Sequence, residues 1–211
     1  MHDCKPVLTP LNPGSRLSTS MSPQNPTEVS EMQVPYISVV GSLMYLAVTI
    51  RPDIAYAAGV LARFNSNPEL SHWPTAKHVL QYLKGTMDYR ITYQPSDSPE
   101  PFITYSDACR SCRQSGQWQV HWRLCGQNWV WSPSVLRMDN QSTIAVSKNP
   151  EHHGRMKHLS LCLFWIRNAV QDELIAPVFV PTQNMAADIF TKALDRFKVQ
   201  KCVHMLGLSS T

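Results

Sequence analysis

Three aspartates occupy positions from which carboxylates of a folded chain can meet. Asp107 ends the β-prone run FITYSD, Asp139 ends the run VLRMD, and Asp188 lies near the start of the predicted helix MAADIFTK. Mg2+ prefers oxygen ligands, so carboxylates from two strand ends and a helix can hold it. Two such ions about 3.5–4 Å apart position a water and stabilise the leaving oxygen in phosphodiester hydrolysis. The competing interpretation is three solvated loop or capping aspartates, which are common at such positions.

The segment 105–131 is rich in other residues that can bind a metal or a nucleic acid. It holds four of the six tryptophans and three of the six cysteines, yet it has no helical or strand period. One interpretation is a zinc site, for which the candidate ligands are Cys109, Cys112, His121 and Cys125. A second is a surface on which Trp118, Trp122, Trp129 and Trp131 stack on unpaired bases while neighbouring arginines meet phosphates. A third is a sequence that was never selected to fold.

The bulk composition narrows the class of protein. The 211 residues carry a net charge of +4, which is too mild to identify a partner. Six cysteines without a recognisable secretory signal indicate reduced thiols in an intracellular setting, cytoplasmic or nuclear. The most apolar run, 39–61, is interrupted by Arg51, Pro52 and Asp53, and therefore predicts two soluble helices and no membrane span.

The first half of the chain is predicted to be helical after an irregular start. Residues 1–34 are rich in Pro, Ser, Thr and Asn, and we expect them to be extended or disordered. Apolar residues then recur at helical spacing in three runs, with Pro52 suited to the first turn of the second. Ser71 is a candidate cap for the third helix, and Gly85 is expected to end it. These runs predict a compact helical piece over about 35–86.

The second half is predicted to alternate strands with helices. Short strands are expected at 89–93, 102–105, 135–138 and 177–180, with helices at 141–147, 156–170 and 185–194. This alternation predicts an α/β layer from about residue 100 onward. Within such a layer, Asp107 and Asp139 would follow two strands.

Ordered sequence blocks along the chain resemble the Pol polyprotein of copia-type LTR retrotransposons. Blocks in the second half resemble its RNase H region: Asp139-Asn140-Gln141-Ser142, Ile144-Ala145, Lys148-Asn149-Pro150, Lys157-His158, Phe179-Val180-Pro181-Thr182 and Ala187-Asp188-Ile189-Phe190-Thr191-Lys192-Ala193-Leu194. Blocks in the first half resemble the helical end of its reverse transcriptase: Pro35-Tyr36, Val40-Gly41-Ser42-Leu43-Met44-Tyr45-Leu46-Ala47, Arg51-Pro52-Asp53-Ile54 and Leu80-Gln81-Tyr82-Leu83-Lys84-Gly85-Thr86. Each block is short, but the ordered set is specific.

The resemblance implies a fold, a parent activity and a division into domains. It implies a helical reverse-transcriptase tail over 35–98, followed by an incomplete RNase H-like α/β domain over 99–208, a mixed sheet with flanking helices. The parent enzyme uses Mg2+ to cleave the RNA strand of an RNA–DNA hybrid, and by the resemblance Asp107, Asp139 and Asp188 correspond to its acidic metal ligands. The implied partner is such a hybrid or another nucleic acid, with neither a membrane nor a small-molecule substrate.

Elements that the parent activities require are missing from the sequence. The family site also uses a glutamate on a helix between the first two aspartates, but no Asp or Glu lies between Asp107 and Asp139. The paired-aspartate motif of the polymerase, Tyr-x-Asp-Asp, does not occur in this chain. Without the bridging carboxylate, too little negative charge lies between two neighbouring cations to offset their mutual repulsion. We therefore expect no stably bound Mg2+ and little or no nuclease activity. The alternatives are a residual Mg2+-dependent RNase H and a non-catalytic nucleic-acid-binding module.

The tryptophans of 105–131 support the hypothesis of an out-of-frame segment over 108–133. The tryptophan codon TGG, read one nucleotide later, always begins GGN, which encodes glycine. The four tryptophans then become the pattern G-x-x-x-G-x-x-x-x-x-x-G-x-G, in register with the glycines of the family hairpin D-S-G-R-x-x-G-G-Y-V-V-x-x-G-x-G. The nucleotide sequence around codons 105–135 tests this hypothesis. Its +1 frame must encode the glycine hairpin.

Overall fold

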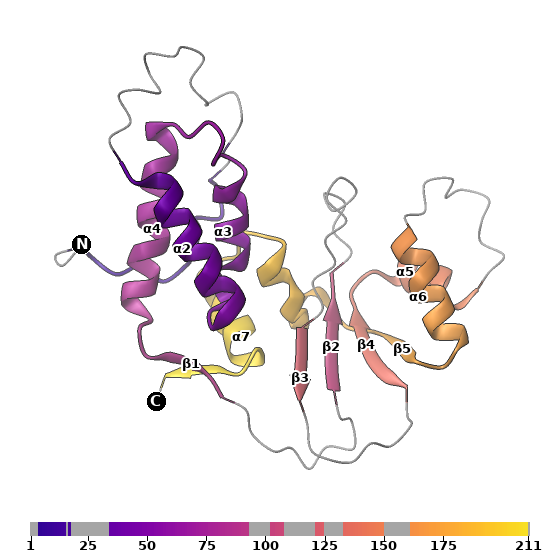
Figure 1. Ribbon diagram of the computed structural model, residues 1–211. Coiled ribbons are helices and arrows are strands. Elements are labelled where there is room, and N and C mark those ends of the chain that lie inside the picture. Colours follow the sequence, from indigo (N-terminus) through magenta and orange to yellow (C-terminus); the bar gives the residue numbers. More distant parts are fainter. Residues whose placement is uncertain are drawn as a thin grey trace. The chain divides into compact units, whose positions relative to one another are not determined.

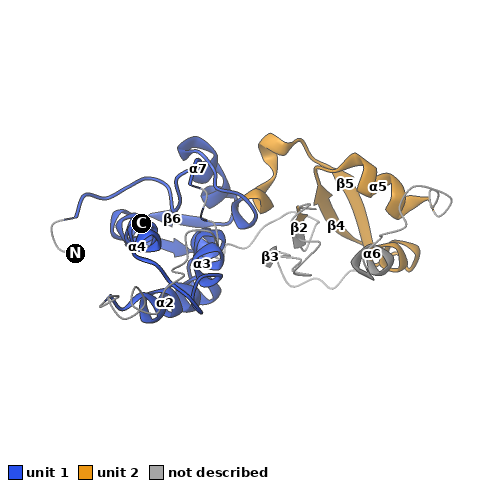
Figure 2. Ribbon diagram, turned by 90° about the horizontal axis from the view of Figure 1, so that it is seen from above, with its two compact units in different colours: residues 1–92, 189–211 blue, residues 93–188 orange. Residues whose placement is uncertain are grey.

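The computed structural model describes residues 4–15, 17, 34–92, 102–107, 121–124, 133–149 and 161–210. The chain is mixed α/β and divides into two compact units (Figure 2). Unit 1 comprises residues 1–92 and 189–211, and unit 2 comprises residues 93–188. The predicted domain 99–208 is thus divided, because its last part packs with the helices of unit 1. In the described part of the chain, no helix is both long and apolar enough to cross a membrane.

Three α-helices build the core of unit 1, as the apolar spacing predicts (Figure 1). They are α2 (Tyr36–Thr49), α3 (Ala55–Ala62) and α4 (Trp73–Gly85). The side chains of Tyr36, Val40, Leu43 and Ala47 recur every three or four residues and are buried along one face of α2. Pro52 begins a 3₁₀ turn before α3, and Pro74 lies in the first turn of α4. Their fixed φ suits these first turns.

The extended segment 4–15 packs on α4. Lys84 Nζ donates to the carbonyl oxygen of Cys4 at 3.0 Å, and His78 Nε2 donates to that of Thr9 at 3.0 Å. A Cβ at Gly85 would lie 2.9 Å from Cβ of Pro6, so any larger residue would push the segment away. Gly85 does end α4 as predicted, but close approach of the chain, and not a left-handed φ, explains the glycine. The rest of the predicted segment 1–34 lies outside the described residues, apart from 17 and 34.

The C-terminal segment completes unit 1. It contains α7 (Arg196–Met205) and β6 (Leu208–Ser210), and β6 pairs antiparallel with β1 (Tyr89–Ile91). Asp195 caps α7 by accepting from the backbone N–H of Lys198 at 3.0 Å, and Gly207 takes a φ of 75° after its end. Val199, Cys202 and Val203 are buried in a second cluster with Leu208. Pairing and burial together hold this segment on unit 1.

His72 lies buried at the start of α4. The start of α4 is preceded by the 3₁₀ turn Leu70–His72. The N-cap residue is Glu69 for this turn and His72 for α4, so the predicted cap Ser71 is wrong. The backbone N–H of Glu69 donates to His72 Nδ1 at 3.1 Å, and the buried imidazole stacks on Phe64 with ring centroids 4.2 Å apart. Burial lowers the pKa of His72 below 6.5, although the Glu69 charge acts in the opposite direction. The folded state therefore holds a neutral imidazole.

We expect acid to destabilise unit 1 through His72. The unfolded chain binds the proton more readily, so the contribution to stability is present above the unfolded pKa and is lost as pH falls below it. Urea unfolding from about pH 7.5 down to about pH 5.5 should show a falling free energy of unfolding. In the His72→Gln variant the amide oxygen can still accept from the backbone N–H of Glu69. Its free energy of unfolding should fall less steeply as pH falls. Equal slopes for the two proteins would exclude His72 as the cause.

The described residues of unit 2 form a four-stranded mixed sheet and two α-helices. Its strand order is β3-β2-β4-β5, made of β2 (Phe102–Ser106), β3 (His121–Leu124), β4 (Ser134–Met138) and β5 (Ile175–Phe179). Strand β4 is parallel to both β2 and β5, whereas β3 is antiparallel to β2 at the edge. Helices α5 (Gln141–Lys148) and α6 (Leu161–Gln171) contact each other and β5 (Figure 1). The sheet edge where β2 and β4 end carries the candidate site.

Candidate metal centre

The pairing of β2 with β4 places two of the predicted carboxylates side by side. In this parallel pair Ser106 lies opposite Met138, the last residue of each strand. Asp107 and Asp139 are the next residues, so both follow neighbouring strand ends at the same edge of the sheet. Each side chain is half-buried. The short strand runs before the two aspartates therefore fix where their carboxylates lie.

The third carboxylate comes from the chain that follows β5. The backbone N–H of Val180 donates to the carbonyl oxygen of Met138 at 2.8 Å, which holds the exit of β5 beside the end of β4. A 3₁₀ turn over Thr182–Asn184 then leads to a second one over Ala186–Phe190, which contains Asp188. The side chain of Asp188 is fully buried, next to the buried Ala187. This turn replaces the longer helix predicted for 185–194.

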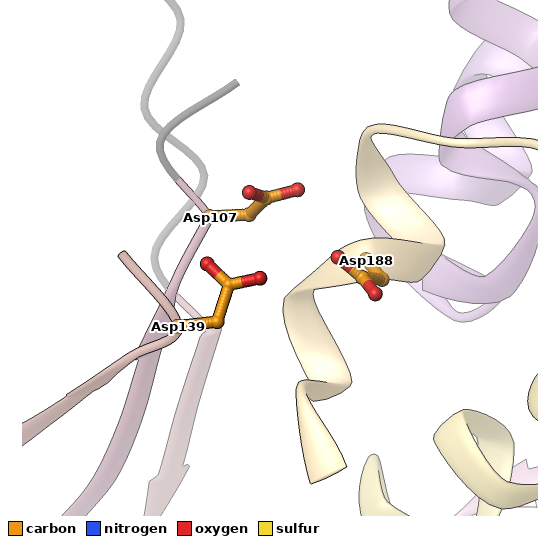
Figure 3. A group of neighbouring side chains, drawn as sticks. All are labelled: Asp107, Asp139 and Asp188. Atoms are coloured by element: carbon orange, nitrogen blue, oxygen red, sulfur yellow. The ribbon is translucent and has the colours of Figure 1, made fainter. Parts of the chain in front are cut away.

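The three carboxylates converge. One oxygen from each of Asp107, Asp139 and Asp188 lies within 4.8 Å of the others, and their carboxylate groups face one another (Figure 3). Two oxygens on opposite sides of a bound Mg2+ are roughly 4.2 Å apart, because each Mg–O bond is about 2.1 Å. An all-oxygen donor set suits a hard cation such as Mg2+ or Mn2+ better than zinc. These residues fit one divalent ion after a small inward movement.

A hydroxyl group orients one of the three carboxylates. Thr182 Oγ1 donates to Asp139 Oδ2 at 3.1 Å. The next residue, Asn140, caps α5 by accepting from the backbone N–H of Thr143 at 3.1 Å, so the chain is also fixed just after Asp139. Groups that hydrogen-bond a ligating carboxylate set its direction and strengthen metal binding. Thr182 is in this position although it lies 43 residues from Asp139 in the sequence.

Replacement of Thr182 should weaken metal binding without unfolding unit 2. In Thr182→Val the hydroxyl is lost while the shape is kept, and the Asp139 carboxylate gains rotational freedom. We expect the affinity for Mn2+ to fall about tenfold, a usual effect for a group that orients a metal ligand. Isothermal titration calorimetry measures the change. Thr182→Ser keeps the donor and should bind as the wild type does; equal loss in both variants would mean that the hydroxyl does not orient Asp139.

The other sequence candidates fall outside the described side chains. The possible zinc ligands Cys109, Cys112 and Cys125, three of the four tryptophans, and the block Lys157-His158 lie in parts of the chain that are not described, and for Trp122 only the backbone, in β3, is described. For His121 only the backbone, in β3, is described. Within the described ranges, the three aspartates form the group of potential metal ligands that converges. The zinc, base-stacking and out-of-frame hypotheses for this segment stay predictions.

Comparison with known proteins connects the whole chain to transposon polyproteins. It is 33% identical to a retrovirus-related Pol polyprotein from transposon TNT 1-94 of Nicotiana tabacum, over 100% of this chain and 19% of that protein. The retrovirus-related Pol polyproteins from transposons RE2 and RE1 of Arabidopsis thaliana are 30% and 29% identical, each over 99% of this chain and 17% of theirs. No protein-family profile and no solved structure matches.

The alignments also contain residues that this chain lacks. The alignment with the tobacco polyprotein runs over 253 positions, whereas the chain has 211 residues, so at least 42 positions have no counterpart here. The chain thus spans about a fifth of the length of these relatives, and it omits residues within the aligned span.

Proposed function

The chain belongs to the Pol polyproteins of copia-type retrotransposons, and from this premise we propose that unit 2 derives from their RNase H domain. The sequence alone predicts no stably bound Mg2+, but we propose instead that unit 2 keeps a carboxylate site for one divalent cation and has lost efficient hydrolysis of RNA–DNA hybrids. The convergence of Asp107, Asp139 and Asp188 within 4.8 Å carries this proposal. Residues 35–98 would then derive from the C-terminal end of the reverse transcriptase, without its polymerase site.

The fold of unit 2 supports the RNase H origin. The resemblance implies a mixed sheet flanked by helices, with acidic residues brought together from strand ends and a helical turn. Unit 2 has a mixed sheet contacted by α5 and α6, and its aspartates follow β2 and β4 and lie in a 3₁₀ turn. The agreement is informative because successive members of the three are 32 and 49 positions apart in the sequence. The pairing of Ser106 with Met138 places Asp107 and Asp139 side by side. Solvated loop aspartates that met by chance would need no such pairing.

The missing glutamate supports the loss of hydrolysis. Two divalent cations bring four positive charges, whereas three carboxylates supply three negative ones. A two-ion arrangement with the ions about 3.5–4 Å apart needs a bridging carboxylate to reduce their repulsion. At least 42 positions of the alignment have no counterpart in this chain, which is consistent with an internal loss that includes the helix carrying the glutamate. One ion suits the remaining carboxylates better than two.

An assay with a labelled RNA–DNA hybrid tests this function. The full chain with Mg2+ should bind the hybrid in a salt-dependent manner and leave it intact, at the same background as Asp139→Asn. Cleavage by the wild type that disappears in Asp139→Asn would instead support a residual nuclease, which the assembled aspartates make the second candidate. The same titration without Mg2+ shows whether hybrid binding needs the metal.

A further inference from the structure

We propose that Arg137, oriented by Tyr105, contacts a phosphate of a nucleic acid bound at the carboxylate site. This inference rests on the proposed function and adds a substrate-contacting residue to it. Arg137 lies on β4 and Tyr105 on β2, two residues before Asp139 and Asp107 respectively.

The register places the pair on the same sheet face as the carboxylates. Tyr105 is opposite Arg137 in the parallel pairing of β2 with β4. Side chains alternate along a strand, so residues two apart share a face, roughly 6–7 Å from each other. If the alternation continues one residue past the end of β4, Asp139 lies on the same face as Arg137, while the buried Leu136 and Met138 lie on the opposite face. A polymeric substrate that reaches the carboxylates passes within reach of the guanidinium.

The contacts of Arg137 give its guanidinium a defined direction. Its Nη1 donates to Tyr105 Oη at 3.1 Å, and its Cζ lies 5.6 Å from the centre of the same ring. Tyr105 is 7% exposed, so its ring is packed in place, whereas Arg137 is half-buried. A guanidinium held in one direction loses less entropy when it binds an anion, and its planar fork matches phosphate geometry. Arg137 is thus prepared for an anionic ligand.

The positive charge of Arg137 can offset the repulsion between the three carboxylates and a nucleic-acid phosphate. Three carboxylates repel the phosphates of a nucleic acid, and one divalent ion offsets only part of their charge. A fixed cation on the same face would offset more of it where the backbone passes. Arg167, another arginine of unit 2, is buried and donates to the carbonyl oxygen of Val146 at 3.2 Å, so it supports α5. Arg137 is the better placed of the two to meet a phosphate.

Hybrid binding by Arg137→Gln tests the proposal. We expect affinity for a labelled RNA–DNA hybrid to fall about tenfold at low salt, and the slope of log affinity against log salt to decrease by about 1. Tyr105→Phe keeps the aromatic face and loses the hydroxyl acceptor, so its effect should be smaller. Arg90→Gln removes an exposed arginine of unit 1 and is the matched control, with no expected change beyond its general charge. Mn2+ binding and circular dichroism of each variant report on the site and the fold.

Each outcome of this experiment decides the proposal. Weaker hybrid binding with unchanged Mn2+ affinity supports a phosphate contact. Unchanged hybrid affinity and salt slope would overturn it, and so would tighter Mn2+ binding without a hybrid effect, which would make Arg137 an internal counter-charge to the carboxylates. If Arg137→Gln unfolds, Arg137→Lys keeps the charge and should recover part of the affinity. Failure of the wild type to bind Mn2+ would reject the metal site itself and is seen before any Arg137 variant is measured.

Discussion

Replacing Asp53 with alanine is expected to lower the free energy of unfolding of unit 1 by about 3–5 kcal/mol, the usual effect of breaking a buried ion pair from one side. Asp53 accepts from Arg51 Nε at 2.9 Å and Nη2 at 2.8 Å, and from Tyr82 Oη at 2.8 Å. Arg51 and Asp53 are only 5% and 1% exposed. The variant would leave a buried guanidinium without its anion.

The network around Asp53 explains why the effect should be large. Burial alone would lower the pKa of Arg51, but the hydrogen bonds and charge of Asp53 raise it above its usual value. Burial, followed by the Asp53 charge, also raises the pKa of Tyr82, so its hydroxyl stays protonated and donates. Arg51 Nη1 reaches the carbonyl oxygen of Thr86 at 2.8 Å and thereby ties the start of α3 to the end of α4. Loss of Asp53 weakens all of these connections.

Urea unfolding of the full chain measures this change. The exposed Asp88→Ala should stay within about 0.5 kcal/mol of the wild type, since surface substitutions rarely cost more. The double variant Arg51→Met, Asp53→Leu removes both charges and should be less destabilised than Asp53→Ala. If the double variant has the lower free energy of unfolding, packing rather than charge stabilises the contact between the start of α3 and the end of α4.

Asp139→Asn is expected to reduce the affinity for Mn2+ by at least about tenfold, with little change in fold. The substitution keeps the side-chain shape but removes one of the three charges that converge within 4.8 Å. An amide oxygen is a weaker ligand than a carboxylate for a hard dication. Loss of charge also reduces the repulsion among the remaining groups, so the variant should be no less stable than the wild type.

The matched control for this variant is Asp172→Asn. Asp172 lies in the turn after α6, in the same unit, and is exposed. The control removes the same charge from unit 2 and should bind Mn2+ as the wild type does. Equal losses in the two variants would point to a general charge effect instead of a built site.

The sequence predicted those parts of the fold in which one period dominates. The helical spacing of Val40, Leu43 and Ala47 identified α2, and the short apolar runs before Asp107 and Asp139 identified β2 and β4. Helix α7 was missed because few apolar residues mark it, although Asp195 and Gly207 are the capping signals that could have located it. The pairing of β1 with β6 joins residues more than a hundred positions apart, which local patterns cannot specify.

The convergence of the three aspartates was predictable from the sequence, but the groups that support them were not. Strand ends and the family blocks pointed to the three aspartates. The hydrogen bond from Thr182 to Asp139 and the pair of Tyr105 with Arg137 depend on the register of the sheet and on the path of the chain after β5. Neither follows from spacing along the sequence, because the partners are 43 and 32 residues apart.

Counting the Mn2+ ions bound per chain tests the central claim most directly. Electron paramagnetic resonance of the full chain, titrated with Mn2+ in the presence of an uncleavable RNA–DNA hybrid, gives this number. A site of three carboxylates without the bridging glutamate predicts one ion per chain, displaced by Mg2+ and lost in Asp139→Asn. Two ions per chain would contradict the account, because a two-ion centre would then have survived without the glutamate. Binding that persists unchanged in Asp139→Asn would contradict it as well.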